Sequence, residues 1–384
     1  MTKRVAILTL HWSNNYGAVL QVYALSTFLK NRGYEVEVIN YKMEPSQKRK
    51  IFSHPVKFIQ KMYSRGLLSP LNLIEKLSEK QQVGVSSITK QKIFDDFRNK
   101  HLNIMQEAYK AKELSSNNLD FDAFIVGSDQ VWAADFLFTS PTYLLSFVPD
   151  DKIKISYAAS FGKKSLEQYL KPIFNRYVNR LDYISVREKS GLDIVSDFRD
   201  DACQVLDPTL LLDNYDDIVS IPNESEYILV YKLNQEKSLS DYFLSQIESI
   251  SSMTGYKVIY ISPDGSLDLP SGDIRLPSPN ELLGLIKNAK IVLTNSFHGL
   301  VFSIVFKKPF LGFERDLFED KQNLRLTGLL GMCGIEDNLV KFGTSLDAAS
   351  LDKLLSIDYD AVDVNLCREK EKSISFLLNS LDKQ

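Results

Sequence analysis

The residue best suited to proton transfer is His298, in the segment Thr294-Asn295-Ser296-Phe297-His298-Gly299. The apolar run 291–294 predicts a strand before this segment, and the apolar residues 297–306 predict a helix after it. His298 therefore falls in the first helical turn. Its imidazole titrates near neutral pH, which suits general acid–base catalysis. The polar residues at the strand end favour a functional site over a structural histidine.

Three further segments place polar residues directly after predicted strands. They are Ser13-Asn14-Asn15-Tyr16-Gly17-Ala18, Gly127-Ser128-Asp129-Gln130-Val131-Trp132 and Ser185-Val186-Arg187-Glu188. In the first, the glycine and the following helix start offer close backbone approach and free N–H groups to an anion. In the second, polar groups and an indole suit a sugar. In the third, the guanidinium suits a carboxylate or phosphate. The alternatives are helix caps, a core tryptophan and a salt bridge.

Two arginines and one asparagine, Arg315, Asn323 and Arg325, add polar groups near the same predicted edge, with plain surface positions as their alternative. No metal site is expected. The pair Asp120 and Asp122 has the spacing of a metal-binding D-x-D motif, but aspartate before a strand is more often a turn former. The sequence has no phosphate-binding G-x-x-x-x-G-K-[ST] motif and no strand-linked G-x-G-x-x-G motif.

The elements that must position these groups alternate between strands and helices. Strands are predicted at 4–10, 35–40, 121–126, 153–157, 183–186 and 203–206, and again at 227–231, 257–261, 291–294 and 309–313. This pattern predicts an α/β fold of two Rossmann-like lobes with a cleft between them. The N-terminal lobe covers 1–212, the C-terminal lobe covers 213–345, and 346–384 forms helices that pack back across the lobes.

Composition excludes several classes of protein. The 384 residues carry a net charge of −3, which argues against nucleic acid as the main partner. No apolar run approaches the roughly 20 residues of a membrane span. Three scattered cysteines and no signal sequence predict a cytoplasmic protein. The segment 42–66 has seven basic residues and one acidic residue, so it is either a solvated insertion or a contact with the inner face of the membrane.

The ordered series of motifs resembles the polysaccharide pyruvyl transferase family, in the branch of capsule and exopolysaccharide gene clusters. Besides the segments already named, Ser156-Tyr157-Ala158-Ala159-Ser160-Phe161-Gly162, Leu206-Asp207-Pro208-Thr209 and Asn323-Leu324-Arg325-Leu326 contribute to the match, which runs over residues 4–335. The resemblance implies a fold like that of the GT-B glycosyltransferases. It implies phosphoenolpyruvate as donor, a sugar diol as acceptor and a pyruvate ketal on a cell-surface glycan as product. The co-substrate needs no further cofactor.

The resemblance also implies roles for individual residues. The family's catalytic histidine carries over to His298, with Arg187 beside it. Some members have an arginine two residues before that histidine, where this chain has Ser296, so Arg187, Arg315 or Arg325 must bind the donor's anionic groups. The donor set is Arg187, Ser296, His298, Gly299, Arg315, Asn323 and Arg325. The acceptor set is Asn14, Asn15, Tyr16, Gly17, Asp129, Gln130 and Trp132, and the acceptor is a galactose-containing or other glycan, with lipid linkage open.

Two other classes of function stay open from the sequence. The first is a GT-B glycosyltransferase that uses a nucleotide sugar, for which Glu314 and Glu319 are available but form no convincing paired motif. The second is a glycan-binding protein without catalysis, against which the histidine and arginines near one cleft count.

Overall fold

A computed structural model describes residues 2–43, 83–233, 235–261, 263, 269–270, 272–316 and 323–382. Of the basic segment 42–66, only Lys42 and Met43 lie within these ranges. The membrane contact of this segment therefore stays a prediction. Within the described ranges, none of the helices combines the length and the apolar character needed to cross a membrane.

The N-terminal lobe is built on a six-stranded parallel sheet in the order β2-β1-β3-β4-β5-β6. Its strands are β1 (Arg4–Leu8), β2 (Glu35–Val38), β3 (Ala123–Gly127), β4 (Ile153–Ala159), β5 (Tyr183–Val186) and β6 (Cys203–Gln204). Its helices are α1 (Tyr16–Lys30), α5 (Val83–His101), α6 (Ala111–Ser116), α7 (Ala134–Thr139), α8 (Lys171–Val178) and α9 (Lys189–Ser196). Strands β1 and β3 are almost entirely buried because helices cover both faces of the sheet.

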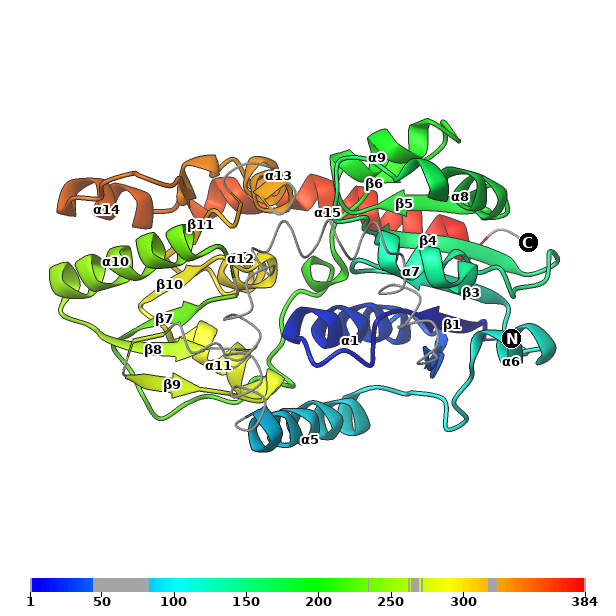
Figure 1. Cartoon of the computed structure of the whole chain (residues 1–384), viewed down its shortest axis with the longest axis horizontal. Helices are drawn as coiled ribbons and strands as arrows, with labels where there is room; N and C mark the ends of the chain where they lie inside the picture. Colours follow the sequence, from blue (N-terminus) through cyan, green and yellow to red (C-terminus); the bar gives the residue numbers. More distant parts are fainter. Residues whose placement is uncertain are drawn as a thin grey trace, which may run out of the picture.

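The C-terminal lobe repeats this plan with the order β12-β11-β10-β7-β8-β9, again parallel throughout. Its strands are β7 (Tyr227–Tyr231), β8 (Lys257–Ile261), β9 (Asp273–Arg275), β10 (Ile291–Thr294), β11 (Phe310–Phe313) and β12 (Leu339–Val340). Its helices are α10 (Lys237–Thr254), α11 (Pro279–Asn288), α12 (Phe297–Val305) and α13 (Asn323–Cys333). The two sheets lie side by side, each with its own helical layers (Figure 1).

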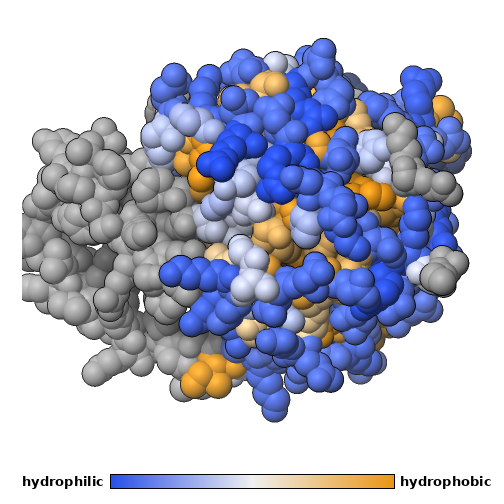
Figure 2. All heavy atoms as spheres, turned by 90° about the vertical axis from the view of Figure 1, so that its right-hand side faces the viewer, coloured by the Kyte–Doolittle hydropathy of each residue, from blue (hydrophilic) through white to orange (hydrophobic). Residues whose placement is uncertain are grey.

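Helices on opposite sides of the molecule join the lobes. After α14 (Ala348–Leu355), the long helix α15 (Tyr359–Asp382) runs back along both lobes (Figure 1). Its Ser373 Oγ accepts a hydrogen bond of 2.9 Å from the Leu206 backbone N–H in the N-terminal lobe. On the other side, α5 packs against α1 of one lobe and α11 of the other. One continuous core therefore contains residues of both lobes. The outer end of the N-terminal lobe is mostly hydrophilic (Figure 2).

These observations confirm the predicted two-lobed α/β architecture and the helical C-terminal segment that packs back. Each of the ten predicted strands is present, most within a few residues of the expected bounds. The short edge strands β9 and β12 and the helices α5 and α13 were not predicted, because their sequences lack a sustained apolar period. Asp120 and Asp122 both bind Arg4, through its side chain and its backbone N–H respectively, as strand-entry residues do.

The strand orders place a topological switch point in each lobe. In the first sheet, β2 is added on one side of β1 and β3 on the other, so the switch point lies between β1 and β3. In the second sheet, β8 and β10 are added on opposite sides of β7, so the switch point lies between β7 and β10. Ligands of open α/β sheets bind beyond the carboxyl ends of the strands at such points. Loop residues 9–15, 128–133, 232–233 and 295–296 directly follow these four strands. The fold therefore predicts that a binding site lies where these loops face one another.

Candidate functional site

Two buried amide side chains fix the loops at the switch points. In the N-terminal lobe, Gln21 donates to Thr9 Oγ1 over 2.9 Å and accepts from the Ser128 N–H over 3.1 Å, so it ties the β1 loop to the β3 loop. In the C-terminal lobe, Asn295 accepts from the Leu233 N–H over 2.7 Å and donates to the Leu233 carbonyl over 3.0 Å. Each amide thus connects the two strands whose loops form the site.

A cavity of about 350 Å³ lies between these loops, and we call it the catalytic cavity. Both lobes contribute to its wall, and seven of the predicted site residues line it. These seven are Asn15, Asp129, Gln130, Ser296, His298, Arg315 and Arg325, and the other lining residues are Leu10, Ser13, Phe136, Leu233 and Phe297. The structure thus brings polar residues of four distant segments of the chain together around one space.

His298 is held at the start of α12 by its surroundings. Ser296 is the N-cap of α12, and its hydroxyl accepts from the Gly299 N–H over 3.4 Å. The N–H groups in the first turn of α12 have no acceptor within the helix. They lie at the end of the helix that faces the cavity. The ring packs on Gly17 so closely that a Cβ added there would lie 2.0 Å from His298 Nδ1. Gly17 therefore lets the backbone of α1 approach the ring of His298, and it does not itself line the cavity.

The electrostatics of His298 favour the neutral imidazole in the unliganded protein. Burial lowers its pKa below 6.5, and the nearby positive charges of Arg187 and Arg325 act in the same direction. The carboxylates of Asp207 and Asp129 oppose this shift. The Nε2 atom makes no hydrogen bond within the described part of the chain, and it lies 3.8 Å from Asp207 Oδ2.

Asp207 is the buried anion of the site, and its side chain is fully inaccessible to solvent. Its Oδ2 accepts from Arg187 Nη1 over 2.8 Å and from Ser128 Oγ over 3.3 Å. Its Oδ1 accepts from the backbone N–H and the hydroxyl of Thr209 over 3.1 and 2.7 Å. These bonds and the charges of His298 and Arg187 outweigh desolvation and hold the pKa of Asp207 below its usual value, so it stays ionised.

Arg187, which is buried, and Arg325, which is half-buried, provide positive charge beside Phe297. Arg187 donates to Asp207 and, over 3.1 Å, to Glu188 Oε1, while its Nη2 lies 4.0 Å from Asp129 Oδ1. Its guanidinium stacks over the Phe297 ring with Cζ 4.7 Å from the centroid. Burial lowers the pKa of Arg325 to about 10, with Arg187 as a further cause, and Arg325 is still a cation at neutral pH.

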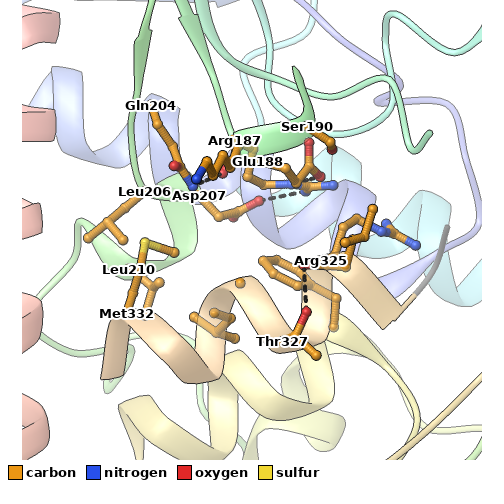
Figure 3. Close-up of a pocket in the computed structure, with 15 residues that line it drawn as sticks. Arg187, Glu188, Ser190, Gln204, Leu206, Asp207, Leu210, Arg325, Thr327 and Met332 are labelled. Atoms are coloured by element: carbon orange, nitrogen blue, oxygen red, sulfur yellow. Dashed lines mark hydrogen bonds and ion pairs between the residues drawn. The ribbon is translucent and has the colours of Figure 1, made fainter. Parts of the chain in front are cut away.

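A second cavity of about 380 Å³ adjoins the first, and Phe297 and Arg325 line both. Figure 3 shows its polar wall, with Arg187, Glu188, Ser190, Gln204 and Asp207, facing the helix that carries Arg325, Thr327 and Met332. Leu206, Leu210, Leu324 and Leu329 add apolar surface. A sugar ring has polar hydroxyls around its edge and apolar faces. A lining that mixes polar and apolar side chains complements such a ring.

Several predicted site residues lie outside the catalytic cavity. Trp132, expected to stack on a sugar, is fully buried in the core, and its indole N–H donates to the Tyr143 carbonyl over 2.9 Å. Tyr16 is also buried and donates to the Pro277 carbonyl over 2.6 Å, a bond between the lobes. Asn14 binds Gln91 and Arg98 of α5. Trp132 thus takes the core position that was its alternative, and the helix cap expected in the segment 13–18 is Asn15, which accepts from the Ala18 N–H.

Two residues of the predicted donor set support the site from behind. Asn323 accepts from the Arg315 N–H over 2.7 Å and donates to the Asp316 carbonyl over 2.8 Å, so it fixes the backbone of Arg315. Gly299 faces Thr294, whose Oγ1 would lie 2.3 Å from an added Cβ. Arg187 lines the second cavity, with its Nη2 directed at Asp129 of the first.

Asp207 and Phe297 were not among the predicted site residues. Asp207 stands in a Leu-Asp-Pro-Thr segment, where an aspartate before proline reads as a turn or cap, and it does cap a short 3₁₀ helix. Phe297 reads as the first apolar residue of a buried helix. The only signal available for Asp207 was that its segment belongs to the ordered series of motifs.

Two parallel-sheet lobes meet at a cavity that holds a histidine and two arginines, and this architecture is of the GT-B type. The chain belongs to the polysaccharide pyruvyl transferase family, whose sequence profile matches residues 15–316. This is the family that the ordered series of motifs resembles.

General stress protein 30 of Bacillus subtilis (strain 168) is 24% identical over 201 residues, which are 50% of this chain and 54% of that protein. The chain thus spans about half the length of this curated relative. Among solved structures, an alpha-glucosyltransferase in complex with UDP and a 13-mer DNA is similar with a TM-score of 0.50 and 8% identity, covering 100% of both chains. A putative UDP-N-acetylglucosamine 2-epimerase from Listeria monocytogenes follows with 0.49 and 10%, covering 100% of this chain and 98% of that one.

The contact between Gly17 and His298 gives a first prediction. In Gly17→Ala the new methyl group cannot share space with the imidazole, so the ring must move and transferase activity should fall at least 10-fold. Gly331→Ala on α13 is the matched control, because its added Cβ would make only an ordinary contact, 3.4 Å from Glu336. Activity assays and melting temperatures of both variants provide the measurement. Full activity in Gly17→Ala would contradict the close packing.

The pairing of Asp207 with His298 gives a second prediction. Asp207 is the largest cause that raises the pKa of His298, so Asp207→Asn should lower that pKa further below 6.5. The chain has four histidines, and NMR titration of their ring protons, assigned with His298→Gln, measures the change. Asp182→Asn, a half-exposed partner of Lys154, is the control. An unchanged or higher His298 pKa in Asp207→Asn would refute the electrostatic coupling.

Proposed function

We propose that this protein transfers the pyruvyl group of phosphoenolpyruvate to two hydroxyls of a sugar, forming a pyruvate ketal in the biosynthesis of a capsule or exopolysaccharide. The observation that carries the proposal is the catalytic cavity, where an imidazole, arginines and a helix N-terminus converge from both lobes. Family membership supports pyruvyl transfer. The donor and the ketal product are those that the family resemblance implies, and the residues of the cavity suit their chemistry.

The donor carries a phosphate and a carboxylate, so its site needs fixed positive charge. Arg315 and Arg325 line the catalytic cavity beside the N-terminus of α12, which attracts anions. Arg187 adds the Nη2 group, which makes no hydrogen bond within the described residues and lies between the two cavities. In this arrangement the donor's anionic groups lie against Arg325 and Arg187, and its methylene carbon faces His298.

His298 acts as the general acid that protonates the methylene carbon. In the unliganded cavity its pKa is below 6.5, so at pH 7 most of the imidazole is neutral. A bound donor brings several negative charges next to the ring, and this raises the pKa toward the protonated form. Donor binding thus charges the acid that the reaction needs. Asn15, Gln130 and Asp129 face the acceptor from the N-terminal lobe.

Replacement of His298 tests the proposal. Purified His298→Ala should release phosphate from phosphoenolpyruvate about 10²–10⁴-fold more slowly than the unmodified protein in the presence of a galactose-terminated glycan. His101→Ala is the matched control, because His101 lies on α5 and lines neither cavity. Near-normal turnover in His298→Ala would remove the histidine from the mechanism.

Melting temperatures distinguish the glycosyltransferase alternative. Phosphoenolpyruvate should raise the melting temperature, whereas a nucleotide-sugar enzyme would respond to UDP or GDP instead. A glycan-binding protein without catalysis would bind the acceptor and release no phosphate.

The second cavity is proposed to hold the part of the acceptor glycan beyond the reacting sugar. Gly328 lines it, and a Cβ added there would meet open space. Gly328→Leu should therefore fill the cavity, raise KM for a long acceptor about 10-fold and leave KM for phosphoenolpyruvate unchanged. Gly331→Ala on the same helix again serves as control. Equal acceptor KM values in both variants would exclude this cavity from acceptor binding.

A further inference from the structure

The proposed reaction needs a group that accepts a proton from the attacking hydroxyl of the acceptor. The imidazolium of His298 gives a proton to the methylene carbon of the donor, and the electron pair of the C=C bond forms the new C–H bond. The central carbon then becomes electrophilic. When the first acceptor hydroxyl attacks this carbon, its proton must pass to a base within the cavity.

Three carboxylates of the described residues lie around the site, and hydrogen bonds and ion pairs hold two of them. Asp207 has no exposed side-chain surface and accepts four hydrogen bonds. Glu188, with 8% of its side chain exposed, accepts from Ser160 Oγ over 2.7 Å and from Arg187 Nε over 3.1 Å. Neither lines the catalytic cavity. Both therefore serve to hold Arg187 and its neighbours.

Asp129 differs from the other two carboxylates. It lines the catalytic cavity, and 18% of its side chain is exposed there. Within the described residues no hydrogen bond to its carboxylate is found, and its ion partner, Arg187 Nη2, is 4.0 Å away. Its backbone is fixed, because its carbonyl accepts from the N–H groups of Val131 and Ser160 over 2.8 and 3.0 Å. The φ angle of +65° is one that glycine or asparagine adopts more readily.

We infer that Asp129 is the general base that takes the proton from the first acceptor hydroxyl. This inference rests on the proposed function and assigns a catalytic role to a residue expected only to bind the acceptor. As the hydroxyl oxygen forms its bond to the central carbon, its proton moves to the carboxylate. The C–O bond to phosphate then breaks, the second hydroxyl closes the ring, and its proton leaves with the phosphate. One proton reaches carbon and one reaches phosphate, and no oxidant or reductant is needed.

Positive and titratable groups face Asp129 from several elements. Arg187 faces it from the end of β5, and His298 of α12 and Arg325 of α13 interact with it electrostatically. Arg315 lines the same cavity from beyond β11. Because Asp129 and His298 share the cavity, the proton that Asp129 gains can return to the imidazole for the next turnover.

Asp129→Asn tests this inference, because asparagine keeps the shape of the side chain and tolerates the backbone angle. We expect turnover to fall about 10²–10⁴-fold, with the melting temperature and its increase on adding phosphoenolpyruvate unchanged. The decline of kcat/KM at low pH, where the base becomes protonated, should disappear, and the decline at high pH should remain. Asp129→Glu, which keeps a carboxylate, should recover part of the activity. Asp122→Asn, at the opposite end of β3, is the control.

Turnover within a few-fold of normal in Asp129→Asn would overturn the inference. So would an equal loss in Asp129→Glu with an unchanged pH profile, because that result would indicate a binding role only. Failure of the proposed function is a different result: the unmodified protein would then release no phosphate from phosphoenolpyruvate with any acceptor glycan.

Discussion

The site depends on one buried ion pair, between Asp207 and Arg187. Removing two charges from water costs several kcal/mol per ion, and their attraction offsets this only if the geometry is good and the remaining lone pairs are satisfied. Thr209 and Ser128 meet that condition for Asp207, whereas Glu188 binds the Nε–H of Arg187 and the Nη2 group makes no hydrogen bond within the described residues. Because the pair sits where α12 of the other lobe begins, it fixes the electrostatic environment of His298. The position of the imidazole is therefore linked to the docking of the lobes.

Backbone geometry explains why this docking places polar groups at one point. Parallel strands all end at the same edge of a sheet, and each lobe has its switch point at that edge. Facing the two edges toward each other brings together loops that are almost 290 residues apart in the chain. Gly17 completes the arrangement, since only a residue without a side chain lets α1 approach the ring of His298.

Much of this could be predicted from the sequence, because buried parallel strands have apolar runs and the residues just after them stand at the ligand-binding edge. That reasoning located Asn15, Asp129, Gln130, Ser296 and His298, which all line one cavity. It did not distinguish a side chain that points into the cavity from one that points into the core. Trp132 and Tyr16 follow strands as well, yet their polar atoms bind backbone carbonyls.

Long-range pairing is what the sequence hides most completely. Asp207 lies 20 positions from Arg187 and 91 from His298, and no local period connects them. An aspartate before proline has a sufficient local explanation as a cap, which Asp207 also fulfils. Its second role, the pairing with Arg187 and His298, arises only when the fold brings three elements together. These are β5, α12 and the segment that follows β6. Edge strands such as β12, with two residues, leave equally little local trace.

The lowered pKa of His298 has a thermodynamic consequence for binding. Burial disfavours the charged ring, so protonation of His298 in the unliganded protein costs folding free energy as the pH falls below 6.5. In the proposed reaction an anionic donor reverses this preference, and linkage then requires that the donor binds more tightly as the pH falls from above the raised pKa of the complex to the lowered pKa of the free protein. Substrate binding and activation of the acid are one event. In the proposed reaction, the burial that keeps the free histidine unprotonated therefore limits proton delivery to the complex, where a carbon atom is present to receive the proton.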